Sequence, residues 1–188
     1  MITTQLGGKF SVEDNGLFNL KKKLINSNIK VNYPKGESIV TVQNGVPLTF
    51  DPQKEKKSFY EIEIQYLKSI RDTDIHIVYN RHINDIGYIG ESASMEIAYA
   101  ILHNKHICLS YLPLYSNKVD PTVKLLIDKN IDKILILNIL ESNDSSFIDS
   151  INKYIENPLN YLFEIQDELC IYKIVETTLN SYMKNEIR

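Results

Sequence analysis

An apolar run followed by a glycine-bearing turn and a helix start restricts the fold of this chain more than any other feature. Ile75–Tyr79 is an apolar run that predicts a buried strand. The segment Gly87–Ala100 then supplies two glycines and two serines, followed by a helix with Glu96 in its first turn. A strand, a turn with glycines and a helix N-terminus form a ligand-binding corner in α/β proteins. We therefore expect a ligand site here, with Glu96 as its reactive carboxylate.

The order of predicted elements indicates a Rossmann-like fold. Strand, helix and strand patterns follow one another at Met1–Leu6, Asn15–Asn26 and Ile29–Tyr33, and this β-α-β order is typical of a parallel sheet. Further helices are expected at 59–70, 92–104, 121–129 and 145–154, and further strands at 107–112 and 131–140. We expect an α/β domain spanning residues 1–188, flavodoxin-like, with a mostly parallel sheet of about five strands and helices on both faces.

Three segments have less certain patterns. Residues 38–50 fit either a small hairpin or an irregular excursion over the sheet, and 51–57 is polar and is expected to form a loop. Residues 169–175 fit either a last strand or the start of a C-terminal helix. The helix at 15–26 has two possible capping residues, Asp14 and Asn15.

Composition argues against several classes of function. The formal net charge of −3 gives no general basis for binding a nucleic acid polymer, and no apolar run reaches the roughly 20 residues of a membrane span. Met1–Phe10 has no signal-peptide pattern, so we expect a cytoplasmic protein. Cys108 and Cys170 lie in apolar runs and are expected to be buried free thiols. The four histidines have no zinc-site spacing, and we expect no metal.

Glu96 has a structural and a chemical interpretation. Acidic residues are favoured in the first turn of a helix, because the unpaired N–H groups there carry partial positive charge. The same amides lower the pKa of a carboxylate and keep it ionised. An ionised carboxylate beside an anomeric carbon acts as a nucleophile or stabilises an oxocarbenium-like transition state.

The residues around Glu96 also allow two interpretations each. Ser92 and Ser94 are either helix caps or ligands for a phosphate or hydroxyl group. Gly87 and Gly90 are either turn residues or positions where the backbone approaches a ligand closely. Gly7–Lys9, at the end of the first strand, forms either a tight turn or a ligand loop.

Three segments together resemble a known superfamily. Asp74–Asn80, Gly87–Ser92 and Met95–Ala100 resemble the nucleoside 2-deoxyribosyltransferase-like superfamily, which includes the deoxynucleoside 5′-monophosphate N-glycosidases. The catalytic glutamate of that superfamily aligns with Glu96. The resemblance spans residues 72–107, extends to the first 33 residues through the glycine-containing loop, and is weak or absent beyond Ser110.

The resemblance implies a function for the chain. It implies cleavage or transfer at the N-glycosidic bond of a nucleoside, nucleotide or related ribosyl compound, with Glu96 acting at C1′ and with no cofactor. It implies a small-molecule substrate and a homo-oligomer, because sites in this superfamily often borrow a residue from a neighbour. The substrate-binding residues that we predict are Gly7, Gly8, Lys9, Asn80, Gly87, Tyr88, Gly90, Ser92 and Ser94.

Two departures from the superfamily pattern leave alternatives open. Gly90 stands where the transferases carry an aspartate and the monophosphate glycosidases a serine. Phe10 stands nearest to the first-loop tyrosine that positions the glutamate, and Tyr88 and Tyr99 are candidate substitutes. Transfer and hydrolysis therefore both remain possible. A nucleotide-binding sensor or interaction module without turnover is the second hypothesis, and a hydrolase that cleaves NAD is the third.

Overall fold

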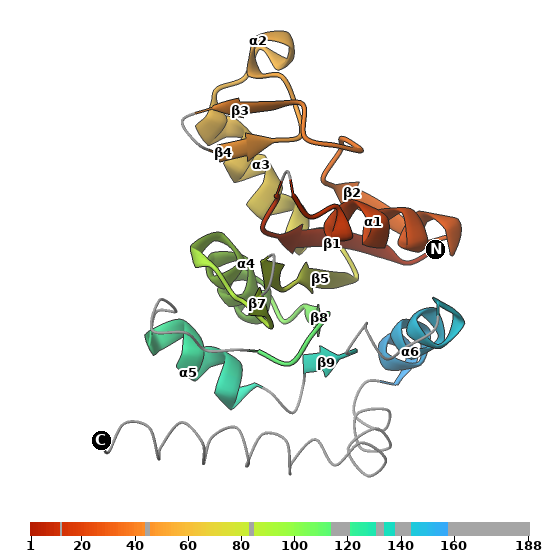
Figure 1. Cartoon of the computed structure of the whole chain (residues 1–188). Coiled ribbons are helices and arrows are strands. Elements are labelled where there is room, and N and C mark those ends of the chain that lie inside the picture. Colours follow the sequence, from red (N-terminus) through yellow and green to blue (C-terminus); the bar gives the residue numbers. More distant parts are fainter. Residues whose placement is uncertain are drawn as a thin grey trace.

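A five-stranded parallel sheet forms the centre of the structure (Figure 1). The computed structural model describes residues 1–11, 13–43, 46–82, 85–113, 121–130, 134–137 and 144–157. In these ranges the sheet has the order β2 (Lys30–Tyr33), β1 (Thr3–Gly8), β5 (Ile75–Tyr79), β8 (His106–Leu109) and β9 (Ile134–Ile136). Counting only the strands of this sheet, the order is 2-1-3-4-5, which is the flavodoxin-like arrangement. The expected fold class is confirmed.

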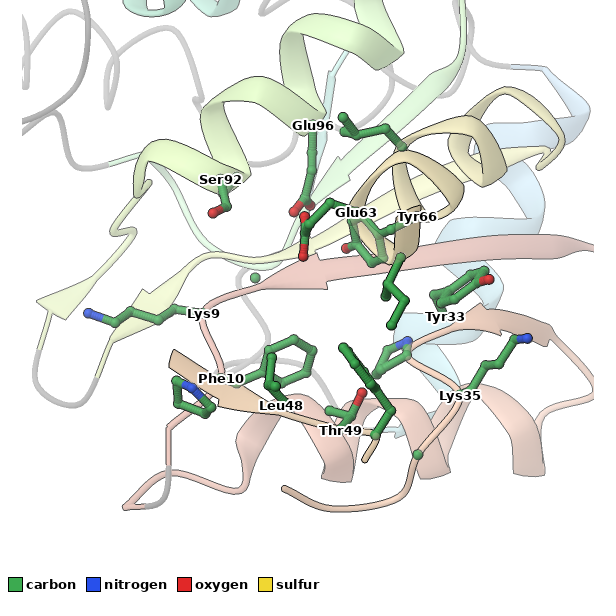
Figure 2. A pocket seen from close by; sticks show the side chains of 18 of the residues that line it. Lys9, Phe10, Tyr33, Lys35, Leu48, Thr49, Glu63, Tyr66, Ser92 and Glu96 are labelled. Carbon is green, nitrogen blue, oxygen red and sulfur yellow. The ribbon is translucent and has the colours of Figure 1, made fainter. Parts of the chain in front are cut away.

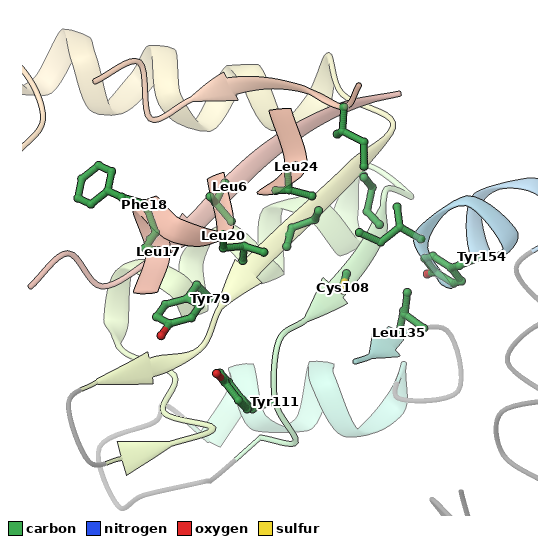
Figure 3. Packing of buried hydrophobic residues seen from close by; sticks show 14 residues of the cluster. Leu6, Leu17, Phe18, Leu20, Leu24, Tyr79, Cys108, Tyr111, Leu135 and Tyr154 are labelled. Atoms are coloured by element: carbon green, nitrogen blue, oxygen red, sulfur yellow. The ribbon is translucent and has the colours of Figure 1, made fainter. Parts of the chain in front are cut away.

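Helices cover both faces of the sheet, as expected. On one face, α1 (Gly16–Asn26) and α6 (Asp144–Glu156) pack through Leu17, Leu24 and Tyr154 against strand residues such as Leu6 and Ile77 (Figure 3). The other face carries α3 (Phe59–Arg71), α4 (Glu91–Leu102) and α5 (Pro121–Lys129). The side chains of a strand alternate between the two faces, so this arrangement sends every second residue of β5 toward α3 and α4.

Local signals explain where these helices begin. Ser58 and Glu61 form a capping box at the start of α3, in which each side chain accepts a hydrogen bond from the other residue's backbone N–H. At the start of α1, the Gly16 N–H donates to Asp14 Oδ1 at 2.8 Å, and Asn15 makes no capping bond with its side chain. Of the two expected capping residues, Asp14 therefore provides the side-chain hydrogen bond.

The segment between β2 and α3 contains more structure than its sequence predicts. Strands β3 (Thr41–Gln43) and β4 (Val46–Leu48) pair as an antiparallel hairpin, which decides between the two interpretations of residues 38–50. The segment expected to be a loop includes a short helix, α2 (Pro52–Glu55), which begins at a proline; proline is favoured at the first helical position. Strands β6 (Arg81–His82) and β7 (Asp85–Ile86) form a second hairpin that is too short to give a periodic pattern.

Several expectations concern parts of the chain that the structure leaves out. The segment 169–175, with Cys170, lies outside the described residues. Cys108 is a buried free thiol, as expected, and burial raises its pKa well above the usual value. Among the described helices, none is long and apolar enough to cross a bilayer.

Candidate functional site

A cavity of about 910 Å³ opens at the carboxyl ends of β1 and β5 (Figure 2). Helices α3 and α4 supply one side of it, and the end of β4 with the two residues that follow it supplies another, through Leu48, Thr49 and Phe50. In the sheet, β2 lies on one side of β1, whereas β5 and β8 lie on the other side, so the strand order changes direction at β1. Open α/β sheets bind their ligands at such a switch in strand order.

Glu96 lies at the inner wall of this cavity. It is only 6 % exposed, it lines the cavity, and it points from α4 toward β1 in Figure 2. It is the sixth residue of α4, so it belongs to the second turn and not to the first. The acidic residue of the first turn is Glu91. The predicted position of Glu96 in the first turn of the helix is therefore wrong, and the surroundings of its carboxylate come from the sheet and from α3.

His76 is the nearest basic group to Glu96. Its Nε2 lies 3.4 Å from Glu96 Oε2, and the imidazole is completely buried. The other nitrogen, Nδ1, lies 3.1 Å from the backbone oxygen of Gln5. A carbonyl oxygen only accepts, so Nδ1 carries the hydrogen of this bond. Nε2 therefore faces Glu96 Oε2, and neither of these two atoms has a hydrogen-bond partner among the described residues.

Gly7 gives Glu96 the space to approach the sheet. A methyl group at this position would lie 1.9 Å from Glu96 Oε2 and 3.0 Å from the His76 ring. Any larger residue at the end of β1 would therefore displace the carboxylate. This close approach, and not a turn, is the reason for a glycine at position 7.

Helix α3 adds Tyr66 and Glu63 to the surroundings of Glu96. The Tyr66 hydroxyl donates to the Leu6 backbone oxygen at 3.2 Å. Burial, followed by the negative charge of Glu96, raises the pKa of Tyr66 well above its usual value, so the side chain is a neutral phenol. Glu63 lies one turn earlier on α3, and its carboxylate faces the same part of the cavity in Figure 2. Partial desolvation there, followed by the charge of Glu96, raises the pKa of Glu63.

Comparisons with known proteins concern the fold. No protein-family model and no curated protein matches the sequence. Among solved structures, the chain is similar to the Clostridium botulinum CMP N-glycosidase BcmB, with a TM-score of 0.41 and 12 % sequence identity over 81 % of this chain and 98 % of that chain.

The structure brings part of the predicted site together. The predicted residues that line the cavity are Gly8, Lys9, Tyr88, Gly90, Ser92 and Glu96. At the edge of this group, Lys9 Nζ lies 3.2 Å from His82 Nε2 and 5.7 Å from the centre of the Tyr88 ring. Ser92 is exposed and does not cap α4, whose N-cap is Gly90 without a side-chain bond. Its hydroxyl is therefore accessible from the cavity.

The other predicted residues do not line the cavity. Gly7 lies against the Glu96 side chain and leaves room for its carboxylate. Gly87 has a φ of +83°, a left-handed backbone conformation that favours glycine. Ser94 is 5 % exposed, and its hydroxyl has no hydrogen-bond partner among the described residues. Asn80 donates to the Tyr111 backbone oxygen at 2.8 Å and accepts from the Tyr111 N–H at 2.9 Å. Both of its polar groups are thus used in holding the chain that follows β8.

Sequence reasoning did not single out His76, Tyr66 or Glu63. The one signal for His76 is a polar residue inside an otherwise apolar strand, opposite Gln5 in the β1–β5 register. Tyr66 and Glu63 belong to a helix whose pattern shows only amphipathicity. In the ranges that the structure covers, no three His, Cys, Asp or Glu side chains are arranged to hold a metal ion.

Proposed function

We propose that this protein cleaves, or transfers at, the N-glycosidic bond of a nucleoside, nucleotide or related ribosyl compound, with Glu96 acting at C1′. The observation that supports this most directly is a nearly buried carboxylate that opens into the cavity at the ends of β1 and β5. A volume of about 910 Å³ lies within the range of small-molecule sites. A carboxylate held in such a site is suited to attack an anomeric carbon or to stabilise its positive charge.

The lining of the cavity is suited to the three parts of a nucleotide. Phe10, Tyr33 and Tyr88 provide aromatic rings for contact with a base. Ser92 and the backbone at Gly90 provide hydrogen-bonding groups for sugar hydroxyls or a phosphate, next to the start of α4. Tyr66, on α3, places a neutral hydroxyl near Glu96. These three features together support the proposed substrate class.

The test is to measure by chromatography the base that is released from a panel of nucleosides, nucleoside monophosphates and NAD. We expect base release by the wild-type protein and a loss on the order of 10³-fold or more in Glu96→Gln. Glu156→Gln, which removes the same charge from the exposed end of α6 and does not line the cavity, is the matched control and retains activity. Equal turnover by wild type and a folded Glu96→Gln protein would exclude this mechanism.

The same panel separates the alternatives. Nucleotides that raise the melting temperature of the wild-type protein without any base release over hours would favour a sensor. Release of nicotinamide from NAD alone would identify an NAD-cleaving hydrolase. If no compound binds, neither the enzyme nor the sensor hypothesis survives.

A further inference from the structure

Cleavage of an N-glycosidic bond to a neutral base requires a proton. A purine or pyrimidine that leaves as an anion is a poor leaving group, so a general acid protonates it as the C1′–N bond breaks. A carboxylate that attacks C1′ is ionised and has no proton to give. A second titratable group must therefore face the same substrate. This requirement follows from the function proposed above and rests on it.

Glu63 is placed to be this second group. Helix α3 packs against α4, and Glu63 and Tyr66 occupy neighbouring turns on the α3 face that lines the cavity. In Figure 2 the Glu63 carboxylate and the Glu96 carboxylate point into one region of the cavity, from two different helices. A substrate whose C1′ lies at Glu96 therefore has Glu63 within the same part of its binding site.

The surroundings of Glu63 favour its protonated form more than those of an ordinary surface carboxylate. The protein around Glu63 partly desolvates its carboxylate, and the Glu96 charge lies close enough to raise its pKa further. Tyr66 is a poorer proton donor for the substrate, since its hydroxyl already donates to Leu6. Lys57, just before α3, also has a partner already, because its ammonium group donates to Gln65 Oε1 at 3.1 Å. The other titratable groups of the cavity wall are Lys9, Tyr33, Lys35, Glu55, Tyr79, Tyr88 and Glu91.

We propose that Glu63 is the general acid and base of this site. In the first step Glu96 forms a bond to C1′, the C1′–N bond breaks, and its electron pair goes to the base nitrogen system, which takes the proton of Glu63. In the second step Glu63 removes a proton from water, the water oxygen bonds to C1′, and the ester bond breaks with its electron pair returning to Glu96. The sum is hydrolysis, with both carboxyl groups restored.

The leaving group provides the test. Glu63→Gln is compared with wild type on a neutral-base nucleotide that the wild-type protein cleaves and on the N7-methylguanine nucleotide, whose cationic base leaves without a proton. We expect kcat/KM for the neutral base to fall by about 10²- to 10³-fold, and kcat/KM for the cationic base to change by less than about fivefold. Glu156→Gln, which removes an exposed charge at the end of α6 and does not line the cavity, is the matched control and changes neither value.

The second step provides an independent readout. With the cationic substrate, Glu63→Gln forms the bond to Glu96 at the normal rate but activates water slowly. A sugar adduct on Glu96 should therefore accumulate in the intact mass of the variant, and kcat should fall although kcat/KM does not. Glu63 is exposed to the solvent of the cavity, so we expect the variant to melt close to the wild-type temperature.

Two results would overturn the inference about Glu63. One is unchanged kcat/KM on the neutral base. The other is an equal loss on both substrates, since that indicates binding and not proton transfer. Either result leaves Glu96 as the carboxylate at C1′. Turnover that persists in Glu96→Gln instead removes the proposed function itself, so the two failures are distinguishable.

Discussion

Glu96 Oε2 lies 3.4 Å from His76 Nε2, and this contact joins the second turn of α4 to the buried centre of the sheet. His76 is itself held from the other side, because its Nδ1 donates to the Gln5 backbone oxygen in the neighbouring strand. The imidazole thus has one orientation, and the Glu96 carboxylate packs against a residue of a central strand and not of a loop. Such support keeps a reacting group in place before the substrate arrives.

The first prediction concerns this contact. His76→Phe removes the polar partner of Glu96, and we expect kcat to fall on the order of 10²-fold with little change in KM, because a small displacement of a reacting group has an effect of that size. His76→Gln places an amide N–H near the position of Nε2 and should recover part of the loss. His106→Gln is the matched control, because His106 contacts Tyr154 on the other side of the sheet. Steady-state kinetics and melting curves measure all three; full activity in His76→Phe would contradict the prediction.

The second prediction uses the adjacent glycines of β1. In Gly7→Ala the new methyl group meets the Glu96 side chain, so we expect a large loss of activity and a small loss of stability. In Gly8→Ala the methyl group meets the Tyr79 backbone oxygen at 2.5 Å, and the φ of +136° disfavours any side chain. That variant should lose about 1–3 kcal/mol of stability. Urea denaturation and base release measure both effects, and the reverse pattern would contradict this account of Gly7.

Most of the fold could be predicted from local patterns. The strand at Ile75–Tyr79 and the helix at Pro121–Lys129 have the predicted bounds, because each has a distinct apolar pattern and α5 begins at a proline. The start of α4 was harder to place. The serines suggested a cap at 92 or 94, whereas the N-cap is Gly90, and this difference moves Glu96 from the first turn into the second.

The surroundings of Glu96 could not be predicted in the same way. His76, Tyr66 and Glu96 lie on three elements, and their proximity depends on the β1–β5 register and on how α3 and α4 pack. Periodicity predicts which side chains of one helix or strand point to the core, but it does not predict which residue of a neighbouring element they contact. The same is true of Asn80, because its partner is the backbone of Tyr111, 31 positions away, and no local pattern predicts that contact.

The third prediction concerns Asn80. Asn80→Ala leaves the Tyr111 N–H and carbonyl unpaired in a site where Asn80 is 1 % exposed and Tyr111 is 2 % exposed. We expect the free energy of unfolding to fall by about 2–4 kcal/mol, because each buried unpaired group costs about 1–3 kcal/mol. Asn19→Ala, on the exposed side of α1, should stay within about 0.5 kcal/mol of wild type. If Asn80→Ala keeps its stability and changes only KM, Asn80 contacts the substrate as the sequence suggested.

The fourth prediction concerns stability and pH. Asp74 accepts hydrogen bonds from the Thr3 N–H at 2.7 Å and from Thr3 Oγ1 at 2.8 Å, which ties the start of β5 to the start of β1. These two bonds, the backbone one first, lower the pKa of Asp74. The carboxylate is exposed, so we expect Asp74→Ala to cost about 1 kcal/mol at pH 7 and not more.

The pH dependence of the stability difference between wild type and Asp74→Ala separates the effect of charge from the effect of packing. The folded-state pKa of Asp74 lies below the unfolded value, so the stabilisation is complete above the unfolded value of about 3.9 and is lost as the pH falls through the folded-state pKa. The gap in unfolding free energy between wild type and Asp74→Ala should therefore stay constant from pH 7 to pH 5 and narrow below pH 4. Asp128→Asn, on the exposed side of α5, should show no such gap. Urea denaturation at each pH measures it, and a gap that widens on acidification would show that the Thr3 bonds do not favour the ionised carboxylate.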